Sequence, residues 1–271
     1  MKVKRVAALQ MTATDKVTDN LNTIARLVEK AVHQGAELVV LPENLAFMGS
    51  EEERLKVREP AGSGPIQDFL AALAARLKIW IVGGTIPILT EDGARAYARC
   101  YVWDNLGKVA AFYDKIHLFD VRVTEQESYE ESKTTAAGKK GVALDTSVGK
   151  MGLSICYDLR FPELYRSLVQ DGVEIFVVPS AFTAITGAAH WESLLRARAI
   201  ENLSYVVAAA QTGTHVNGRK TFGHSMIIDP WGKILGVLEA GEGVIVADID
   251  LQYLAEVRKR FPALAHRKQQ F

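Results

Sequence analysis

The segment Met151–Pro162 reads Met-Gly-Leu-Ser-Ile-Cys-Tyr-Asp-Leu-Arg-Phe-Pro. It contains a change from a strand to a helix, and the rest of the chain is organised around this change. Its first half is a short apolar run of strand character, and Pro162 begins a helical pattern with proline in its first turn. Cys156 therefore lies where a buried strand gives way to a helix. In an open α/β sheet that junction presents side chains to a ligand, and the N-terminus of a following helix favours a thiolate. In this segment alone, a nucleophilic thiol and a buried structural cysteine are equally compatible with the sequence.

Strands and helices alternate downstream of this segment. The helix from Pro162 ends near Gly172, and a further helix is predicted over 190–202, after a loop of small residues at 181–187. Strands are predicted over 142–146, 150–155, 174–178, 205–210, 226–229, 234–238 and 244–249. This alternation is typical of an α/β protein.

The N-terminal part of the chain opens with a strand–helix–strand unit. A strand is predicted over 3–11, apolar residues recur at helical spacing over 21–32, and a continuous apolar strand over 38–41 ends in Pro42-Glu43. Such a unit implies a right-handed crossover between neighbouring parallel strands.

The middle of the chain contains a hairpin and two polar connections. Residues 51–64 are charged and then rich in Gly and Pro, which indicates a loop, and Pro65 starts a second helix. Residues 120–141 are a polar connection of a length that is usually functional. Further strands are predicted over 79–86, 97–103 and 108–113, of which the last two flank Asp-Asn-Leu-Gly as an antiparallel hairpin.

The composition favours a protein that acts on small molecules. The 271 residues are 48% hydrophobic and no linker divides them, so we expect one α/β domain over residues 1–271, built as a two-sheet sandwich. Lys plus Arg and Asp plus Glu number 32 each, which argues against nucleic acid or an anionic membrane as a partner.

The cysteine content and the N-terminus favour a cytoplasmic protein. There are only two cysteines and no C-x-x-C pair, so a disulfide framework is not expected. The apolar run at 6–9 is shorter than the ~7–15 residues of a signal-peptide core. No apolar run reaches the ~18 residues of a membrane span.

The sequence contains no motif for a metal or a cofactor. Its six histidines form neither His-x-His nor His-Glu-x-x-His, so no metal is expected. Residues 218–225, Gly-Arg-Lys-Thr-Phe-Gly-His-Ser, resemble a phosphate-binding loop, but histidine replaces the lysine that such a loop needs and a strand follows instead of a helix. We therefore expect a reaction without a cofactor.

Three charged residues are candidates to act with the thiol. Glu43 ends a buried strand, Lys115 follows a hairpin strand, and Glu131 lies in the long polar connection, although each alone is more commonly a surface residue. A thiol with a pKa of about 8.5 is mostly protonated at neutral pH, so it needs a base or a nearby cation to act as a nucleophile. In acyl transfer from an amide, Glu43 would supply the base and Lys115 the cation that also holds the oxyanion.

Three motifs in this order resemble the nitrilase superfamily of carbon–nitrogen hydrolases. They are Leu-Pro-Glu at 41–43, Tyr-Asp-Lys-Ile-His-Leu-Phe at 113–119 and Ile-Cys-Tyr-Asp-Leu-Arg-Phe at 155–161. The likeness extends through His-Trp at 190–191 to Asp-Pro-Trp-Gly at 229–232 and so covers nearly the whole chain. The resemblance implies a four-layer α-β-β-α sandwich and a homodimer or higher homo-oligomer that pairs through outer helices.

The resemblance also implies a role for each matching residue. Cys156 forms a thioester with loss of ammonia or an amine, Glu43 is the general base, and Lys115 stabilises the tetrahedral intermediate. Glu131 matches a second glutamate that positions Lys115 and the substrate amide. The backbone N–H of Tyr157 completes the oxyanion hole, and water activated by Glu43 hydrolyses the thioester.

Within the superfamily, the residues after Cys156 and the loop at 182–187 resemble the branch that contains ω-amidase and deaminated glutathione amidase, and the loop at 44–49 is closer to the latter. The implied substrate is a small amide that carries a carboxylate. Arg160 is a candidate anchor because its planar fork suits a carboxylate, with an ion pair to an acid such as Asp158 as the alternative. Three residues would line the same pocket: Phe182, Thr183 and Thr186.

Other functions remain open. The substrate could instead be α-ketoglutaramate or α-ketosuccinamate, as for an ω-amidase, or an N-carbamoyl amino acid. From a different class, the chain could be a ligand-binding scaffold that keeps the fold without turnover. A thiol redox sensor is a further alternative, for which no resolving cysteine is evident.

Overall fold

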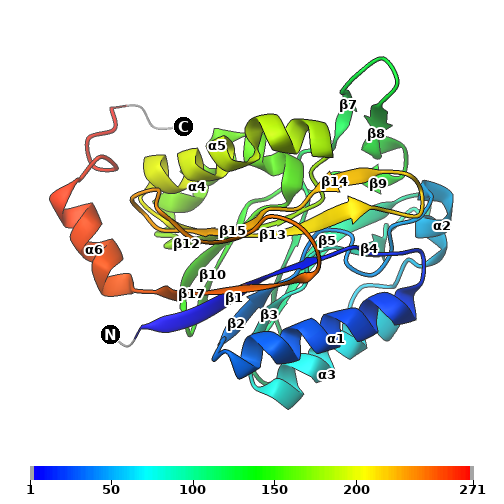
Figure 1. Ribbon diagram of the computed structural model, residues 1–271, viewed down its shortest axis with the longest axis horizontal. Coiled ribbons are helices and arrows are strands. Elements are labelled where there is room, and N and C mark those ends of the chain that lie inside the picture. Colours follow the sequence, from blue (N-terminus) through cyan, green and yellow to red (C-terminus); the bar gives the residue numbers. More distant parts are fainter. Residues whose placement is uncertain (1–2, 269–271) are drawn as a thin grey trace.

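Two β-sheets pack face to face between two layers of helices (Figure 1). The computed structural model describes residues 3–268. Figure 1 shows α1 and α3 on the outer face of one sheet and α4 and α5 on the outer face of the other. The α-helices within residues 3–268 are α1 (Val17–His33), α2 (Glu51–Lys56), α3 (Pro65–Leu77), α4 (Pro162–Gln170), α5 (Ala184–Asn202) and α6 (Leu251–Arg260). This arrangement confirms the four-layer α-β-β-α sandwich.

Hydrogen bonds join the strands of the two sheets into one continuous network. The first sheet contains β1 (Lys4–Met11), β2 (Leu38–Val40), β3 (Trp80–Val82), β4 (Ile86–Leu89), β5 (Ala96–Trp103), β6 (Val109–Asp114), β9 (Thr135–Ala136) and β17 (Gly243–Ile249). The second contains β10 (Val142–Thr146), β11 (Gly149–Leu153), β12 (Ile175–Ser180), β13 (Tyr205–Thr214), β14 (Lys220–Phe222), β15 (Ser225–Ile228) and β16 (Ile234–Leu238). The sheets meet where the last two residues of β1 pair in parallel with β13, Gln10 with Ala210 and Met11 with Gln211.

Alternating side chains of β1 enter two different hydrophobic cores. Val6 and Ala8 pack in the core that contains the strands of the second sheet. Ala7 and Leu9 pack in the core beneath α1 and α3. Because both faces of these strands are buried, their sequences read as continuous apolar runs rather than as alternating ones.

Most of the predicted elements are confirmed. β1, α1 and β2 form the strand–helix–strand unit, with β1 and β2 parallel. β5 and β6 pair antiparallel as the predicted hairpin. Helices begin at Pro65 and Pro162, each with proline in the first turn as predicted.

Two loop predictions were wrong because local capping was overlooked. The range 51–64 contains α2, whose N-cap Ser50 forms a capping box with Glu53. The range 181–187 contains the first turn of α5, which begins at Ala184 because the Thr183 side chain accepts a hydrogen bond from the Thr186 N–H.

The predicted strand over 79–86 was also wrong, since it is divided into β3 and β4. Gly84 between them has φ +50°, and a Cβ at this position would lie 2.0 Å from the Pro42 carbonyl oxygen. The chain therefore turns at Gly84 in order to pass close to the end of β2.

The polar connection at 120–141 is ordered. It forms a two-stranded hairpin of β7 (Asp120–Arg122) and β8 (Ser128–Glu130), then the 3₁₀-helix η1 (Glu131–Lys133) and β9. Figure 1 shows this hairpin standing at the same end of the molecule as α2. None of the helices within residues 3–268 is long and apolar enough to cross a membrane.

Candidate active site

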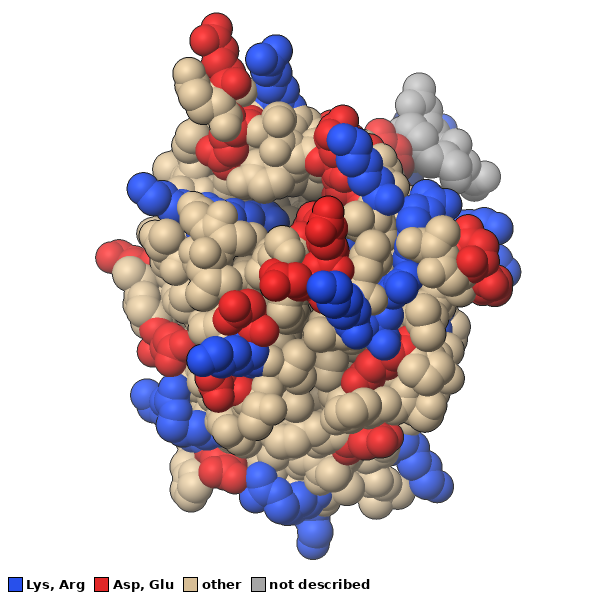
Figure 2. Space-filling view, turned by 90° about the vertical axis from the view of Figure 1, so that its right-hand side faces the viewer, with Lys and Arg blue, Asp and Glu red and all other residues tan. Residues whose placement is uncertain are grey.

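The ends of three strands bring the candidate residues to one cavity of about 190 Å³. Glu43 follows β2, Lys115 follows β6, and Cys156 lies three residues after the end of β11. All three line the cavity together with Glu131 from η1. Residues of α2 and β8 complete its wall, so it lies on the face turned to the viewer in Figure 2. Figure 2 shows basic and acidic side chains interleaved over that face, without an extended area of one sign.

Cys156 occupies a strained turn. It begins the 3₁₀-helix η2 (Cys156–Arg160) and has φ +48°, which residues other than glycine rarely adopt. Strained backbone of this kind is found at active sites, where the surrounding structure holds it. The 3₁₀-helix η2 separates the thiol from α4, which begins at Pro162 as predicted.

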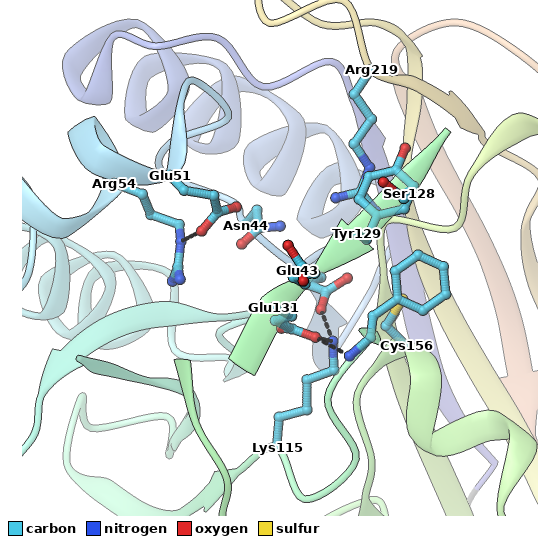
Figure 3. A pocket seen from close by; sticks show the side chains of 12 residues that line it. Glu43, Asn44, Glu51, Arg54, Lys115, Ser128, Tyr129, Glu131, Cys156 and Arg219 are labelled. Carbon is cyan, nitrogen blue, oxygen red and sulfur yellow. Dashed lines mark hydrogen bonds and ion pairs between the residues drawn. The ribbon is translucent and has the colours of Figure 1, made fainter. Parts of the chain in front are cut away.

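Lys115 lies between two glutamates and is hydrogen-bonded to both (Figure 3). Its Nζ lies 2.8 Å from Glu43 Oε1, and 3.0 Å and 2.8 Å from the two carboxylate oxygens of Glu131. Glu43 and Lys115 are 3% and 2% exposed, so little water screens this pair. The backbone of Glu43 is also held, because Gln211 Nε2 donates a hydrogen bond of 2.9 Å to its carbonyl oxygen.

The charges around Lys115 determine the protonation states of the site. Burial by itself raises the pKa of Glu43, but the charge and the hydrogen bond of Lys115 outweigh it and hold that pKa below its ordinary value. Burial by itself lowers the pKa of Lys115, but Glu131 and Glu43 outweigh it and raise that pKa. The site therefore holds an ionised Glu43 beside a charged ammonium.

The thiol of Cys156 is protonated in the resting site. Burial first, and the Glu43 carboxylate next, raise the pKa of the Cys156 thiol well above its ordinary value. The thiol and the Glu43 carboxylate line the same cavity, and that carboxylate is one of the groups that raise the pKa of the thiol. A neutral thiol in the same cavity as an ionised carboxylate is the starting arrangement for general-base activation of a nucleophile.

Asp158 is a buried carboxylate that connects the segment of Lys115 to the turn of the thiol. Its Oδ2 accepts hydrogen bonds from the Tyr113 hydroxyl at 2.7 Å and from the Ile155 N–H at 2.9 Å. Its Oδ1 accepts one from the His117 N–H at 3.0 Å and lies 2.6 Å from His117 Nδ1. Tyr113 and His117 flank Lys115 in the sequence, so one carboxylate fixes the two segments relative to each other. No sequence pattern predicts this role of Asp158.

A smaller apolar cavity shares Cys156 with the larger one. It is lined by Cys156, by Tyr157 and by the three predicted pocket residues Phe182, Thr183 and Thr186. The hydroxyls of Thr183 and Thr186 lie 2.9 Å apart. The structure thus brings all of these residues to the sulfur.

Arg160, the predicted carboxylate anchor, lines neither of these two cavities. Its terminal nitrogens lie 3.3 Å and 3.4 Å from His190 Nδ1, and its guanidinium lies 5.4 Å from the centroid of the Phe182 ring. The alternative ion pair with Asp158 is not formed either, since Asp158 is bonded to Tyr113, Ile155 and His117.

Several cavity residues were missed in the sequence. Glu51 and Arg54 come from α2, and the capping signal Ser-x-x-Glu at 50–53 could have revealed that helix. Arg219 lines both cavities and comes from the segment 218–225 that resembles a phosphate-binding loop. Within residues 3–268, no group of three or more His, Cys, Asp or Glu side chains is arranged to hold a metal ion.

Known proteins resemble this chain over almost its whole length. A deaminated glutathione amidase of Synechocystis sp. is 47% identical over 272 residues, which cover 98% of this chain and 99% of that protein. The crystal structure of the C. elegans NitFhit protein has a TM-score of 0.92 and 37% identity, and the match covers 98% of this chain and 65% of that one. Nit3 of Saccharomyces cerevisiae, a member of branch 10 of the nitrilase superfamily, has a TM-score of 0.89 and 32% identity and is matched over 100% of this chain and 97% of its own.

The sequence also matches the carbon-nitrogen hydrolase family from residue 5 to residue 259. That range includes the three strand ends and the turn at Cys156. The chain therefore belongs to the carbon-nitrogen hydrolases of the nitrilase superfamily, enzymes that hydrolyse carbon–nitrogen bonds other than peptide bonds.

Proposed function

We propose that the protein is a cysteine-dependent amidase that hydrolyses a small, carboxylate-bearing amide, with deaminated glutathione as the first candidate substrate. One observation carries the proposal: the thiol of Cys156 lines the same cavity as Glu43, whose carboxylate is itself 2.8 Å from the Lys115 ammonium. The name of the Synechocystis relative, a deaminated glutathione amidase at 47% identity, supports this substrate.

The first half of the reaction forms a thioester. Glu43 takes the thiol proton while the sulfur of Cys156 attacks the amide carbon, and the carbonyl π electrons move to the oxygen. Lys115 and the backbone N–H of Tyr157 stabilise this oxyanion. When the oxyanion collapses, the carbon–nitrogen bond breaks and Glu43 gives its proton to the leaving nitrogen. The leaving group is ammonia from a primary amide and an amine from a secondary amide.

The second half of the reaction uses water. Glu43 takes a proton from the water as its oxygen attacks the thioester carbon, and the same oxyanion site is used again. Breaking the carbon–sulfur bond releases the carboxylic acid, and the proton returns to the sulfur. In both halves the role of Glu131 is to hold the Lys115 ammonium in place with its two oxygens.

The test is a comparison of the protein with Cys156→Ala. Release of amine or ammonia is measured with deaminated glutathione, α-ketoglutaramate, an N-carbamoyl amino acid and a simple nitrile. We expect kcat on the preferred amide to fall by about 10⁴-fold or more in Cys156→Ala. Intact mass spectrometry during turnover should show an acyl adduct on the protein that keeps Cys156 and none on Cys156→Ala.

Cys100→Ala is the matched control, because Cys100 is also a buried cysteine but lies in β5 and lines neither cavity. It should keep its activity. Turnover by Cys156→Ala at the normal rate would exclude the thioester mechanism. A protein that binds these amides without releasing product would instead be a ligand-binding scaffold. The predicted cytoplasmic location stays a prediction.

A further inference from the structure

Arg219 is a charged residue that lines both cavities and that the mechanism does not use. It precedes β14 at the tip of the β13–β14 hairpin and lines both the larger and the smaller cavity. Figure 3 shows its side chain reaching past the Tyr129 ring toward the region above Glu43 and Cys156. The guanidinium carbon lies 4.9 Å from the centroid of that ring.

The hairpin holds Arg219 in a fixed position. His215 is buried, with its Nδ1 2.9 Å from the Ala13 carbonyl oxygen and its Nε2 2.8 Å from the Thr221 hydroxyl. The turn is closed by a hydrogen bond of 2.9 Å from the His215 N–H to the Arg219 carbonyl oxygen. A side chain presented from such a turn is pre-organised, so little ordering entropy is lost when a ligand binds it.

The other cations of the larger cavity are already paired. Lys115 is bonded to Glu43 and Glu131. Arg54 pairs with Glu51 at 3.0 Å and also donates hydrogen bonds to threonine hydroxyls. Neither is available to a charged substrate unless one of these contacts breaks.

Arg219, in contrast, has no carboxylate within ion-pair distance among residues 3–268. Its Nη2 donates a hydrogen bond to the Ala181 carbonyl oxygen. Its Nε is buried without a hydrogen-bond partner. A buried donor without an acceptor costs free energy that a ligand recovers when it supplies the acceptor.

We propose that Arg219 binds a carboxylate of the substrate and thereby selects acidic amides over neutral ones; this inference rests on the proposed amidase function. The planar guanidinium matches the geometry of a carboxylate. The cavity wall also carries Glu43, Glu51 and Glu131, which repel an anion. An anionic substrate is therefore accepted only where a free cation offsets that repulsion.

Arg219→Gln and Arg219→Lys test this proposal on four amides. Deaminated glutathione has a carboxylate at its acyl end and another on its glycine. Its glycinamide analogue keeps only the first, α-ketoglutaramate has the acyl-end carboxylate with ammonia as leaving group, and butyramide has none.

We expect Arg219→Gln to lower kcat/KM for the acidic amides by about 10- to 100-fold, mainly through KM, and to leave butyramide within about twofold. Arg219→Lys should recover part of the loss because it restores the charge without the fork. A loss that disappears with the glycinamide analogue assigns the contact to the glycine carboxylate. A loss that persists with it assigns the contact to the acyl end.

Arg76→Gln, which removes an exposed arginine of α3, controls for the change in net charge and should have no effect. The proposal is overturned if Arg219→Gln lowers the rates of acidic and neutral amides equally, if it lowers none, or if the charge-selective loss appears in Arg160→Gln instead.

Calorimetric titration of Cys156→Ala with deaminated glutathione, with and without Arg219→Gln, separates the two hypotheses. Binding that weakens with Arg219→Gln, in a protein that never releases product, would reject the amidase function and keep the carboxylate contact. If the unchanged protein turns the substrate over but Cys156→Ala binds it equally well with and without Arg219→Gln, the amidase function is kept and the carboxylate contact is rejected.

Discussion

The proton of the Cys156 thiol and the charge of Glu43 depend on each other. Burial and then the Glu43 carboxylate raise the pKa of the thiol, whereas the pKa of Glu43 is lowered because Lys115 outweighs its burial. The reactive form, a neutral thiol beside an ionised carboxylate, is therefore the form present at neutral pH. A pair that titrates together reports apparent pKa values of the pair rather than of either residue.

The pH dependence of kcat/KM follows from these directions. Glu43 must be ionised to act as base, and its pKa lies below its ordinary value of 4.5, so activity should fall only below that pH. The pKa values of Cys156 and Lys115 are raised, so no alkaline fall is expected up to pH 8. We expect a level profile from pH 5 to pH 8 with an acid limb below it, measured on a substrate whose own charge is constant.

Glu43→Gln should remove that acid limb and lower kcat by about 10²- to 10⁴-fold. Glu29→Gln, which changes an exposed acid of α1, should keep the profile of the unchanged protein. The free energy of unfolding changes with pH in the same direction as the activity. The lowered pKa of Glu43 stabilises the folded protein above pH 4.5, and this contribution is lost as the pH falls through the pKa of the folded state. An acid limb of kcat/KM near pH 6 would contradict the assignment of this limb to Glu43.

At the scale of elements, the turn between β3 and β4 supports the end of β2. Gly84 passes so close that an added Cβ would lie 2.0 Å from the Pro42 carbonyl oxygen. The Thr85 hydroxyl accepts a hydrogen bond of 2.8 Å from the Asn44 N–H. Glu43 lies between these two contacts, so the turn fixes the position of the general base.

Gly84→Ala should therefore move Glu43 as well as destabilise the fold. The positive φ costs ~1 kcal/mol for alanine, and the clash adds ~1–3 kcal/mol. Because a small displacement of a reacting group is costly, we also expect kcat to fall by about tenfold or more. Urea unfolding and steady-state kinetics measure the two effects.

Gly93→Ala is the matched control for this variant. Gly93 also has a positive φ, +68°, but no atom lies within 4 Å of a Cβ placed there. It should lose ~1 kcal/mol of stability and none of its activity. Equal effects of the two substitutions on kcat would show that the contact with Pro42 does not position the base.

At the scale of the whole molecule, an apolar patch lies on the outer surface near α5 and α6. Ile200, Trp231 and Phe261 are 47%, 53% and 51% exposed. The rings of Trp231 and Phe261 are 5.6 Å apart between centroids, and Ile200 lies against Gly232. Clustered apolar residues exposed in this way are typical of protein interfaces.

The resemblance to the nitrilase superfamily implies a homodimer formed through outer helices, and this patch is its predicted contact. Trp231→Glu should shift a dimer toward monomer in sedimentation velocity at micromolar concentration, because burying a charge without a partner is costly. Leu106→Glu, which places the same charge on a 66% exposed leucine of the β5–β6 turn, should leave the assembly unchanged. A wild-type chain that sediments as a monomer at every concentration would exclude this dimer.

The sequence alone determined the order and type of most of the main elements, and its motifs indicated the carbon-nitrogen hydrolase family that matches residues 5–259. Apolar periodicity reports burial along a single element, so the βαβ unit, the β5–β6 hairpin and the helices at Pro65 and Pro162 could be predicted. The motifs around Glu43, Lys115 and Cys156 are local strings, so they could be read in the same way.

Tertiary structure alone decided what surrounds those motifs. Which cation is left without a partner depends on every other charge in the cavity. The cation that lines the cavities of the thiol without a paired carboxylate is therefore Arg219, from the segment that resembles a phosphate-binding loop, and not Arg160, which is close to the nucleophile in the sequence. The division of 79–86 into two strands likewise depends on a contact between Gly84 and Pro42, which are far apart in the sequence. Contacts of this kind come from strand register and packing, which no local pattern encodes.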